Sequence, residues 1–337
     1  MILSTVPVRS PVMCIPYALS DIYDGLRDPM TFHNGLRDVN RSLNSRFFDN
    51  RRKSSSNALS EDWDTLIILD GCRYDIFQDN HTFDGDLRPV YSQGAHSNEF
   101  MQNTFAGQKL HDTVYITANP WSEQLADDTF FLTRTTYTES EQGGQARLPK
   151  DVSQLALDTF EEYPDKRYIV HFMQPNNPYI GPLAKQYRAE LLEEKRVLCT
   201  ELPTPGSENA TPVQDEVPHL RRALRKGYVS QDQMFEVYRE NLEIVTEHAK
   251  KVLDELGGET SITSDHGDMF GERLPPLYIK EFSHWEGVHT QILREVPWLE
   301  INSDERRHIE SGEPRERERI TDESVKDHLE SMGYLSG

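Results

Sequence analysis

Short apolar runs alternate with amphipathic stretches from residue 64 onward. The run TLIIL at 65–69 is rich in β-branched residues and ends at Asp70-Gly71, which is typical of a central parallel strand buried on both faces. Similar runs predict strands at 113–117, 167–172, 261–263 and 297–301, and helical spacing predicts helices at 151–163 and 233–256. This alternation predicts an α/β fold with a mostly parallel central sheet flanked by helices on both faces.

The chain ends and one internal stretch lack this pattern. Residues 1–60 are interrupted by prolines and polar runs, so we expect a peripheral N-terminal segment with one helix at 18–26. The remainder, 61–337, is expected to form a single catalytic domain. Within it, residues 199–218 are rich in Pro, Ser, Thr and acidic residues without a period, which indicates a flexible excursion at about 185–232. Helical spacing returns at 320–335.

Charge narrows the choice of partners. The 337 residues carry 57 acidic and 36 basic side chains, and the formal net charge of −21 repels nucleic acids and anionic membranes. Because the surface is acidic and lysine is scarce beside arginine, the composition suits a halophilic protein; an ordinary acidic protein is the alternative.

Two further features bear on location. No apolar run reaches the roughly 18–20 residues of a spanning helix, and prolines interrupt the N-terminus, so neither a membrane span nor a secretory signal is expected. The three cysteines lie far apart without a CxxC pair, which favours a reducing, cytoplasmic location.

Polar residues that directly follow predicted strands are candidates for chemistry, because ligands bind at the carboxyl ends of parallel strands. Asp70 follows 65–69, and Asp265-His266 follow 261–263. A carboxylate beside an imidazole suits Zn²⁺ or Mn²⁺ better than Ca²⁺. The alternative is a turn-forming Asp70 and a solvated His266 in a polar turn.

Ser97 precedes the helical spacing of Phe100, Met101 and Phe105 and is therefore predicted to be the N-cap of a short helix at 98–105. That capping role is a sufficient explanation by itself. The functional alternative is a nucleophile, because a helix N-terminus favours an oxyanion and a nearby metal lowers the pKa of a hydroxyl.

Three histidines complete the candidates. His171 follows a strand pattern, and His284 and His289 lie close together in FSHWEGVH, where either one suits a metal site or a general acid. The polar loop 174–179, which contains Asn176, is placed to line the same cleft. Structural or surface roles are the alternative for each histidine.

The chain resembles the sulfatase-like branch of the alkaline phosphatase superfamily over 64–335. The segments that carry the resemblance are LIILDGCRYD, the Ser before a short helix, YIVHFMQPNNPYIGP, SITSDHGDMFGE, FSHWEGVH, and REVPWLEI with a terminal helix ending MGYL. SDHGDMFGE is the most specific, being similar to the S-D-H-G-x-x-x-G-E segment of that branch. The DGCRYD opening resembles divergent haloarchaeal members.

The resemblance implies a set of roles for these residues. Asp70, Asp265 and His266 would bind a divalent metal, which the residues do not narrow among Mn²⁺, Zn²⁺, Ca²⁺ and Mg²⁺, and Ser97 would be the nucleophile bound to it. His171 and His284 would contact the substrate or leaving group or help to hold a second metal. The remaining residues, which would face an anionic ester substrate such as a glycan or lipid head group, are Arg73, Asn176 and His289.

Three departures from the family pattern bear on the reaction. Neither Ser97 nor Cys72 lies in the C/S-x-P-x-R sequence that yields formylglycine in sulfatases, which favours phosphoester over sulfate ester chemistry. Asn176 stands where the family pattern Q-P-H-x-P-Y has a histidine, which indicates a shifted substrate or a weakened catalyst.

Two other functions compete with the metal-dependent hydrolase or transferase. One is a catalytically degenerate protein that binds metal and ligand on the same fold. The other is a cofactor-independent phosphoglycerate mutase-like enzyme, which needs two metals and an inserted domain; the excursion at 185–232 is too short and irregular for such a domain.

Overall fold

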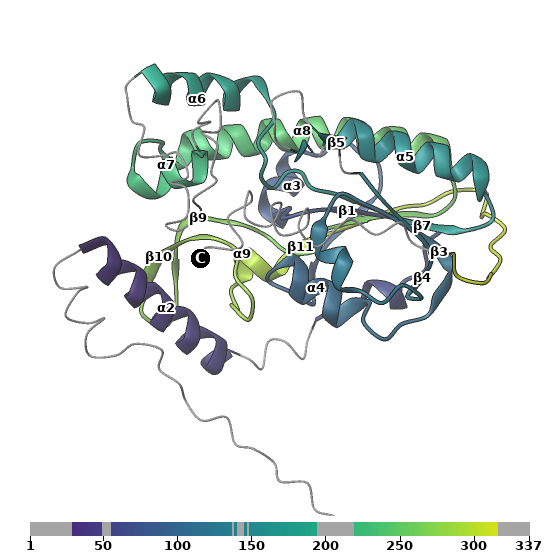
Figure 1. The fold of residues 1–337 in the computed structure, drawn as a ribbon, viewed down its shortest axis with the longest axis horizontal. Helices are drawn as coiled ribbons and strands as arrows, with labels where there is room; N and C mark the ends of the chain where they lie inside the picture. Colours follow the sequence, from purple (N-terminus) through teal and green to yellow (C-terminus); the bar gives the residue numbers. More distant parts are fainter. Residues whose placement is uncertain are drawn as a thin grey trace, which may run out of the picture.

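The central feature of the fold is a seven-stranded sheet with the order β2-β11-β8-β1-β7-β3-β4 (Figure 1). The computed structural model describes residues 29–48, 55–136, 138–139, 145–146, 148–193 and 219–315. Within this sheet, β11 runs antiparallel to both of its neighbours, β2 and β8, and all other neighbouring strands are parallel. The strands of the sheet are β1 (Thr65–Leu69), β2 (Asp86–Tyr91), β3 (Leu110–Thr117), β4 (Phe130–Thr135), β7 (Arg167–Phe172), β8 (Thr260–Thr263) and β11 (Glu295–Ile301).

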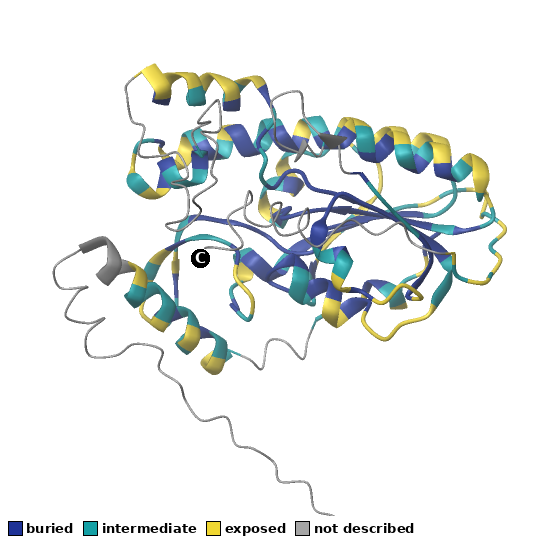
Figure 2. Ribbon diagram, in the orientation of Figure 1, coloured by how far each residue is buried: buried dark blue, intermediate teal, exposed yellow. Residues whose placement is uncertain are grey.

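Helices cover both faces of the sheet. On the face to which Ile67 and Leu69 belong lie α3 (Tyr74–Asn80), α5 (Pro149–Glu162) and α8 (Gln231–Leu256). On the face of Leu66 and Ile68 lie α4 (Ser97–Thr104) and the short helix η3 (Pro120–Gln124). Figure 2 shows the strands buried between these layers. Burial on both faces explains the continuous run TLIIL, and the predicted fold class is confirmed.

The helix ends follow local sequence rules. Helix α8 begins with a capping box between Ser230 and Gln233 and ends at Gly257, whose φ is +59°, in agreement with the predicted stop. Helix α5 begins at Pro149, two residues earlier than predicted, because proline is favoured in the first turn of a helix.

A smaller layer forms around a hairpin that follows β8. Strands β9 (Met269–Leu274) and β10 (Ile279–Ser283) pair antiparallel, and α2 (Pro29–Phe48) and α7 (Leu220–Lys226) both contact them. Two buried asparagines fix α2 on the hairpin: the side-chain amide of Asn40 donates to the Leu274 carbonyl at 2.9 Å, and that of Asn44 donates to the Pro275 carbonyl at 2.9 Å. The further elements are η2 (Ala58–Ser60), β5 (Thr138–Glu139), β6 (Gln145–Ala146), α6 (Pro182–Glu193) and α9 (Gln291–Arg294).

Several predictions concern residues outside the described part of the chain. These are the helix at 18–26, the irregular stretch 199–218 and the helix at 320–335. The rest of the predicted excursion at 185–232 is largely helical where it is described, in α6, α7 and the start of α8. Strands β2 and β4 were not predicted. Strand β2 lies at a sheet edge, contains Pro89 and has half of its residues exposed, and only the first half of β4 is buried.

Candidate metal centre and catalytic site

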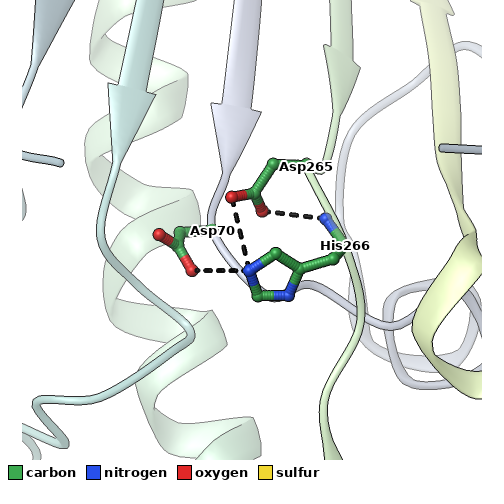
Figure 3. A group of neighbouring side chains, drawn as sticks. All are labelled: Asp70, Asp265 and His266. Carbon is green, nitrogen blue, oxygen red and sulfur yellow. Dashed lines mark hydrogen bonds and ion pairs between the residues drawn. The ribbon is translucent and has the colours of Figure 1, made fainter. Parts of the chain in front are cut away.

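Asp70, Asp265 and His266 converge because β1 and β8 are adjacent and parallel. Each of these residues comes just after its strand, so the three side chains meet at one edge of the sheet (Figure 3). His266 Nε2 lies 3.4 Å from Asp265 Oδ2 and 3.7 Å from Asp70 Oδ1, and one ligand atom from each of the three residues lies within 4.8 Å of the others. All three are fully buried.

The unsatisfied polar atoms of this cluster fit a metal ion. His266 Nδ1 lies 2.7 Å from the Gly267 carbonyl, so Nδ1 donates there and Nε2 presents its lone pair to the two carboxylates. Asp265 Oδ2 and His171 Nε2 have no hydrogen-bond partner among the described residues and lie 3.7 Å apart. Buried polar atoms are normally paired, and a divalent cation would satisfy these atoms. Asp70, Asp265 and His266 are therefore a chemically suitable donor set.

The pKa shifts of the three residues also indicate that the cluster lacks a compensating positive charge. Burial, together with the neighbouring Asp265 carboxylate, raises the pKa of Asp70 to about 7. Burial raises the pKa of Asp265 to about 6 and lowers the pKa of His266. The raised pKa values of Asp70 and Asp265 disfavour the carboxylate forms that bind metal only while no cation is present, because a bound cation stabilises carboxylates. The lowered pKa of His266 favours the neutral imidazole, which is the form that binds metal.

Amides hold the two carboxylates in place. The side-chain amides of Asn119 and Asn176 donate to Asp70 Oδ2 and Oδ1 at 2.7 and 2.6 Å. Asp265 Oδ1 accepts from the backbone amides of Gly71 and His266 at 3.0 and 2.9 Å. Asn176 therefore supports a candidate ligand, and Asn119 is a site residue that the sequence analysis missed. Its position just after the predicted strand 113–117 was the available signal.

Ser97 faces the cluster, and the prediction that it is an N-cap is wrong by one residue. His96 is the N-cap of α4, because its Nδ1 accepts from the Asn98 backbone amide at 3.1 Å. Ser97 is then the first residue of the helix, which leaves its hydroxyl available for the site. Its Oγ lies 3.1 Å from His266 Nε2 and 3.3 Å from Asp70 Oδ2.

A second polar group lies beside the cluster. His284 Nδ1 is 3.5 Å from Asp268 Oδ1, and the ring centroids of His284 and His266 are 4.1 Å apart. Arg221 of α7 forms an ion pair with Asp268 and a hydrogen bond with Asn176 Oδ1. Burial raises the pKa of Asp268 to about 6 and, together with His266, lowers the pKa of His284 well below its usual value.

Arg221 and Asp268 are also residues that the sequence analysis missed. Asp268 stands within SDHGDMFGE and could have been identified by its place after the strand. No sequence pattern linked Arg221 to the site, because it follows the irregular stretch and reaches Asp268 only through the packing of α7.

Three predicted site residues lie elsewhere or face the cluster differently. Arg73 pairs with Asp75 at 2.7 Å and with Glu272 at 2.5 Å, so two carboxylates already compensate its charge. His289 binds Arg294 through Nδ1 at 3.0 Å. His171 lies within β7, where its Nδ1 is 2.9 Å from the Tyr115 hydroxyl and its Nε2 faces Asp265.

Comparisons with known proteins identify similar solved structures. No family model matches the chain, and no curated protein matches its sequence. The periplasmic domain of the Escherichia coli phosphoethanolamine transferase EptC, determined with Zn, has 15% identity and a TM-score of 0.43, covering 71% of this chain and 72% of that one.

Two other solved structures show comparable similarity. A protein in complex with its substrate D-glucosamine-2-N,6-O-disulfate has 12% identity and a TM-score of 0.43, covering 81% of this chain and 77% of that one. An alkaline phosphatase superfamily protein from Vibrio parahaemolyticus has 14% identity and a TM-score of 0.36, covering 80% and 65%. At these identities and TM-scores the function has to be inferred from the side chains of the site itself.

The described helices include none with the length and apolar composition needed to cross a bilayer.

Proposed function

We propose that the protein is a metal-dependent hydrolase or transferase of phosphoric or sulfuric esters in which Ser97 is the nucleophile. The observation that carries this proposal is the position of Ser97 Oγ, 3.1 Å from His266 Nε2 and 3.3 Å from Asp70 Oδ2. A hydroxyl that contacts two of three candidate metal ligands is placed to become a ligand itself. Phosphoesters are the favoured substrates, because Ser97 lacks the sequence that yields formylglycine.

Asp70, Asp265 and His266 would hold the divalent ion. When bound, the ion would lower the pKa of the Ser97 hydroxyl and withdraw charge from the ester oxygens. Zn²⁺ and Mn²⁺ suit the mixed oxygen and nitrogen donors best, and Ca²⁺ and Mg²⁺ belong in the same test.

The other polar residues take the remaining roles. In the proposed reaction, Ser97 Oγ forms a bond to phosphorus, the bond from phosphorus to the leaving oxygen breaks, and Asp70 Oδ2 is within reach of the hydroxyl proton. In its protonated form, the Asp268–His284 pair would give a proton to the leaving oxygen. Water or an acceptor alcohol then removes the group from Ser97 in a second displacement.

The test compares wild type with Ser97→Ala across Mn²⁺, Zn²⁺, Mg²⁺ and Ca²⁺ on chromogenic phosphomonoester, phosphodiester and sulfate ester substrates. We expect metal-dependent turnover that falls by about a thousand-fold or more in Ser97→Ala. Ser153→Ala is the matched control, because Ser153 is also a buried helical serine but contacts Lys150 and His248 instead. Turnover that survives in Ser97→Ala would disprove the role of this residue.

The second candidate is a protein that binds metal and ligand without turnover. The observation that favours it is the full burial of Ser97, Asp70, Asp265 and His266. This candidate predicts metal binding by wild type and Ser97→Ala alike, with no turnover of any of the three ester classes.

A further inference from the structure

A group of arginines lies beside the candidate site without contacting its metal ligands. Arg37 and Arg41 come from α2 and Arg225 comes from α7, and these two helices pack against the hairpin of β9 and β10 from different sides (Figure 1). Arg37 Nε donates to the Lys280 carbonyl at 3.1 Å, and its guanidinium lies 5.3 Å from the Phe282 ring centroid. Arg225 donates to the Asn34 side-chain oxygen. Side chains that are far apart in the sequence thus meet over β10.

Two of these arginines are not paired with a carboxylate. Arg41 binds Glu281 through Nε at 2.8 Å and Asp38 through Nη1 at 2.8 Å. Among the described residues, neither Arg37 nor Arg225 forms an ion pair; a main-chain carbonyl and an amide oxygen hold them instead. In a chain of net charge −21, two neighbouring arginines without a direct ion pair are unexpected, and the nearby Glu281 carboxylate offsets only part of the repulsion on Arg225.

The two side chains are close enough to affect each other. Burial lowers the pKa of Arg225, the charges of Arg37 and Arg41 lower it further, and Glu281 opposes them. Burial also lowers the pKa of Arg37, where Glu281 opposes the shift and Arg41 adds to it. An anion bound between Arg37 and Arg225 would relieve this repulsion.

The arginine group is connected to the candidate site by two short paths. Helix α7 carries both Arg225 and Arg221, and a spacing of four residues corresponds to about 6 Å along a helix. Strand β10 leads from Glu281 beneath the arginines to His284, a distance of about 10 Å at the rise of an extended strand. Arg221 also touches β10, because it donates to Ser283 Oγ at 3.1 Å.

We propose that Arg37 and Arg225 form a second anion-binding subsite, which holds a negatively charged group of the substrate beside the candidate site. This inference rests on the proposed function and narrows its substrate class to esters that carry a second anionic group. Arg41 contributes less, because Glu281 and Asp38 already compensate its charge. A charged sugar and a charged lipid head group share this chemistry.

The test measures binding instead of turnover. Alkane-α,ω-bisphosphonates of increasing chain length are titrated by calorimetry into the metal-loaded full-length protein, beside alkylphosphonates of the same lengths. We expect a single optimum of chain length, with affinity about ten-fold or more above that of the matching monophosphonate.

Two double variants test whether the arginines are responsible. In Arg37→Gln/Arg225→Gln, each side chain keeps an amide donor for its present acceptor and loses its charge, and we expect the advantage of the bisphosphonate to disappear. The control is Arg88→Gln/Lys109→Gln, which removes two charges that already pair with carboxylates elsewhere on the surface. It should keep the full advantage. Thermal unfolding of both variants checks that they fold.

The outcomes separate the two proposals. Bisphosphonates that bind no better than monophosphonates at any length, or an advantage that survives in the arginine variant, would overturn the subsite and leave the proposed function standing. If neither phosphonate binds the metal-loaded protein, the proposed function fails and the subsite fails with it. Displacement of the bound bisphosphonate by a sulfated disaccharide or by a short-chain phosphoinositide distinguishes a glycan from a lipid head group.

Discussion

Two buried aspartates at opposite ends of β1 experience opposite environments. Asp64 precedes the strand and accepts hydrogen bonds from Arg306 at 3.0 and 3.1 Å and from the backbone amides of Glu259 and Arg307. Although burial alone raises the pKa of Asp64, these hydrogen bonds lower it below its usual value. Asp70 follows the strand and accepts hydrogen bonds only from neutral groups among the described residues, and its pKa rises to about 7.

The difference shows how a structural carboxylate differs from a candidate metal ligand. An arginine compensates the charge of Asp64 within the fold, so this carboxylate stabilises the folded chain. Within the described part of the chain, no arginine or lysine pairs with Asp70 or Asp265, and a bound ion would supply the missing positive charge. Burial alone does not separate the two cases, because Asp64 and Asp70 are both almost completely buried.

The largest expected effect is that of Asp70→Asn on activity and metal binding. Because the carboxylate supplies charge to the metal and accepts the Ser97 hydrogen bond, we expect a loss of about a thousand-fold or more in turnover. Calorimetry with Zn²⁺ and Mn²⁺ should show that tight binding is lost. A variant that binds metal as tightly as wild type would remove Asp70 from the ligand set.

Asp64→Asn should lower stability and leave metal binding and turnover unchanged. Loss of the charged partner of Arg306 should lower the free energy of unfolding by about 1–3 kcal/mol near neutral pH, while turnover per folded molecule stays unchanged. Because the folded-state pKa of Asp64 is lowered, its stabilisation is present above about pH 4 and is lost as pH falls through the folded-state pKa. Urea unfolding at pH 7 and pH 3 measures the loss of unfolding free energy and its dependence on pH. If Asp64→Asn abolished metal binding, the distinction between a structural Asp64 and a metal-binding Asp70 would be wrong.

Asn119→Ala tests the support of Asp70 by a neutral amide. The variant loses the hydrogen bond to Asp70 Oδ2 while all three candidate ligands remain. We expect metal affinity to fall by about 10–100-fold, the usual cost of losing an outer-shell partner. Asn103→Ala is the matched control, because the Asn103 amide donates to the Gln93 carbonyl at an exposed position. Equal affinities in wild type and Asn119→Ala would show that Asn119 has no part in the site.

The smallest effect concerns stability without added metal. The raised pKa values of Asp70 and Asp265 mean that the folded protein retains protons that the unfolded chain releases near about pH 4. Stability of the metal-free protein should therefore fall as pH rises from about 4 to about 7, and the gain in Tm from a divalent metal should grow over the same window. Thermal unfolding with and without a chelator measures this gain. A gain that shrinks with rising pH would contradict the assigned shifts.

Local patterns in the sequence were sufficient for much of the fold and for the candidate metal ligands. The run 65–69 and the strand patterns at 167–172 and 261–263 place β1, β7 and β8, whose ends carry the polar residues. The rule that ligands bind at the carboxyl ends of parallel strands then identified Asp70, Asp265 and His266 before their distances were known. The peripheral N-terminal segment, the halophilic character and the cytoplasmic location stay predictions.

Sequence patterns were insufficient where the contact partner lies far along the chain. For Ser97 the sequence leaves a capping role and a nucleophilic role open, because serine suits both. In the structure the ring of His96 caps the helix, and Ser97 Oγ lies 3.1 Å from His266 Nε2. Arg73 is adjacent to Asp70 in the sequence but pairs with Asp75 and Glu272. Arg221 reaches the site through a helix that no motif linked to it.

By itself, the sequence determined the class of fold and the chemistry at the ends of its strands, because burial on both faces and strand ends follow from local periodicity. The tertiary structure decided which charges are compensated. Arg306 neutralises Asp64, Arg221 neutralises Asp268, and Asp70 and Asp265 face each other with no cation from the described chain. Compensation depends on contacts between residues far apart in the sequence, as between Asp64 and Arg306, and local periodicity carries no information about such contacts.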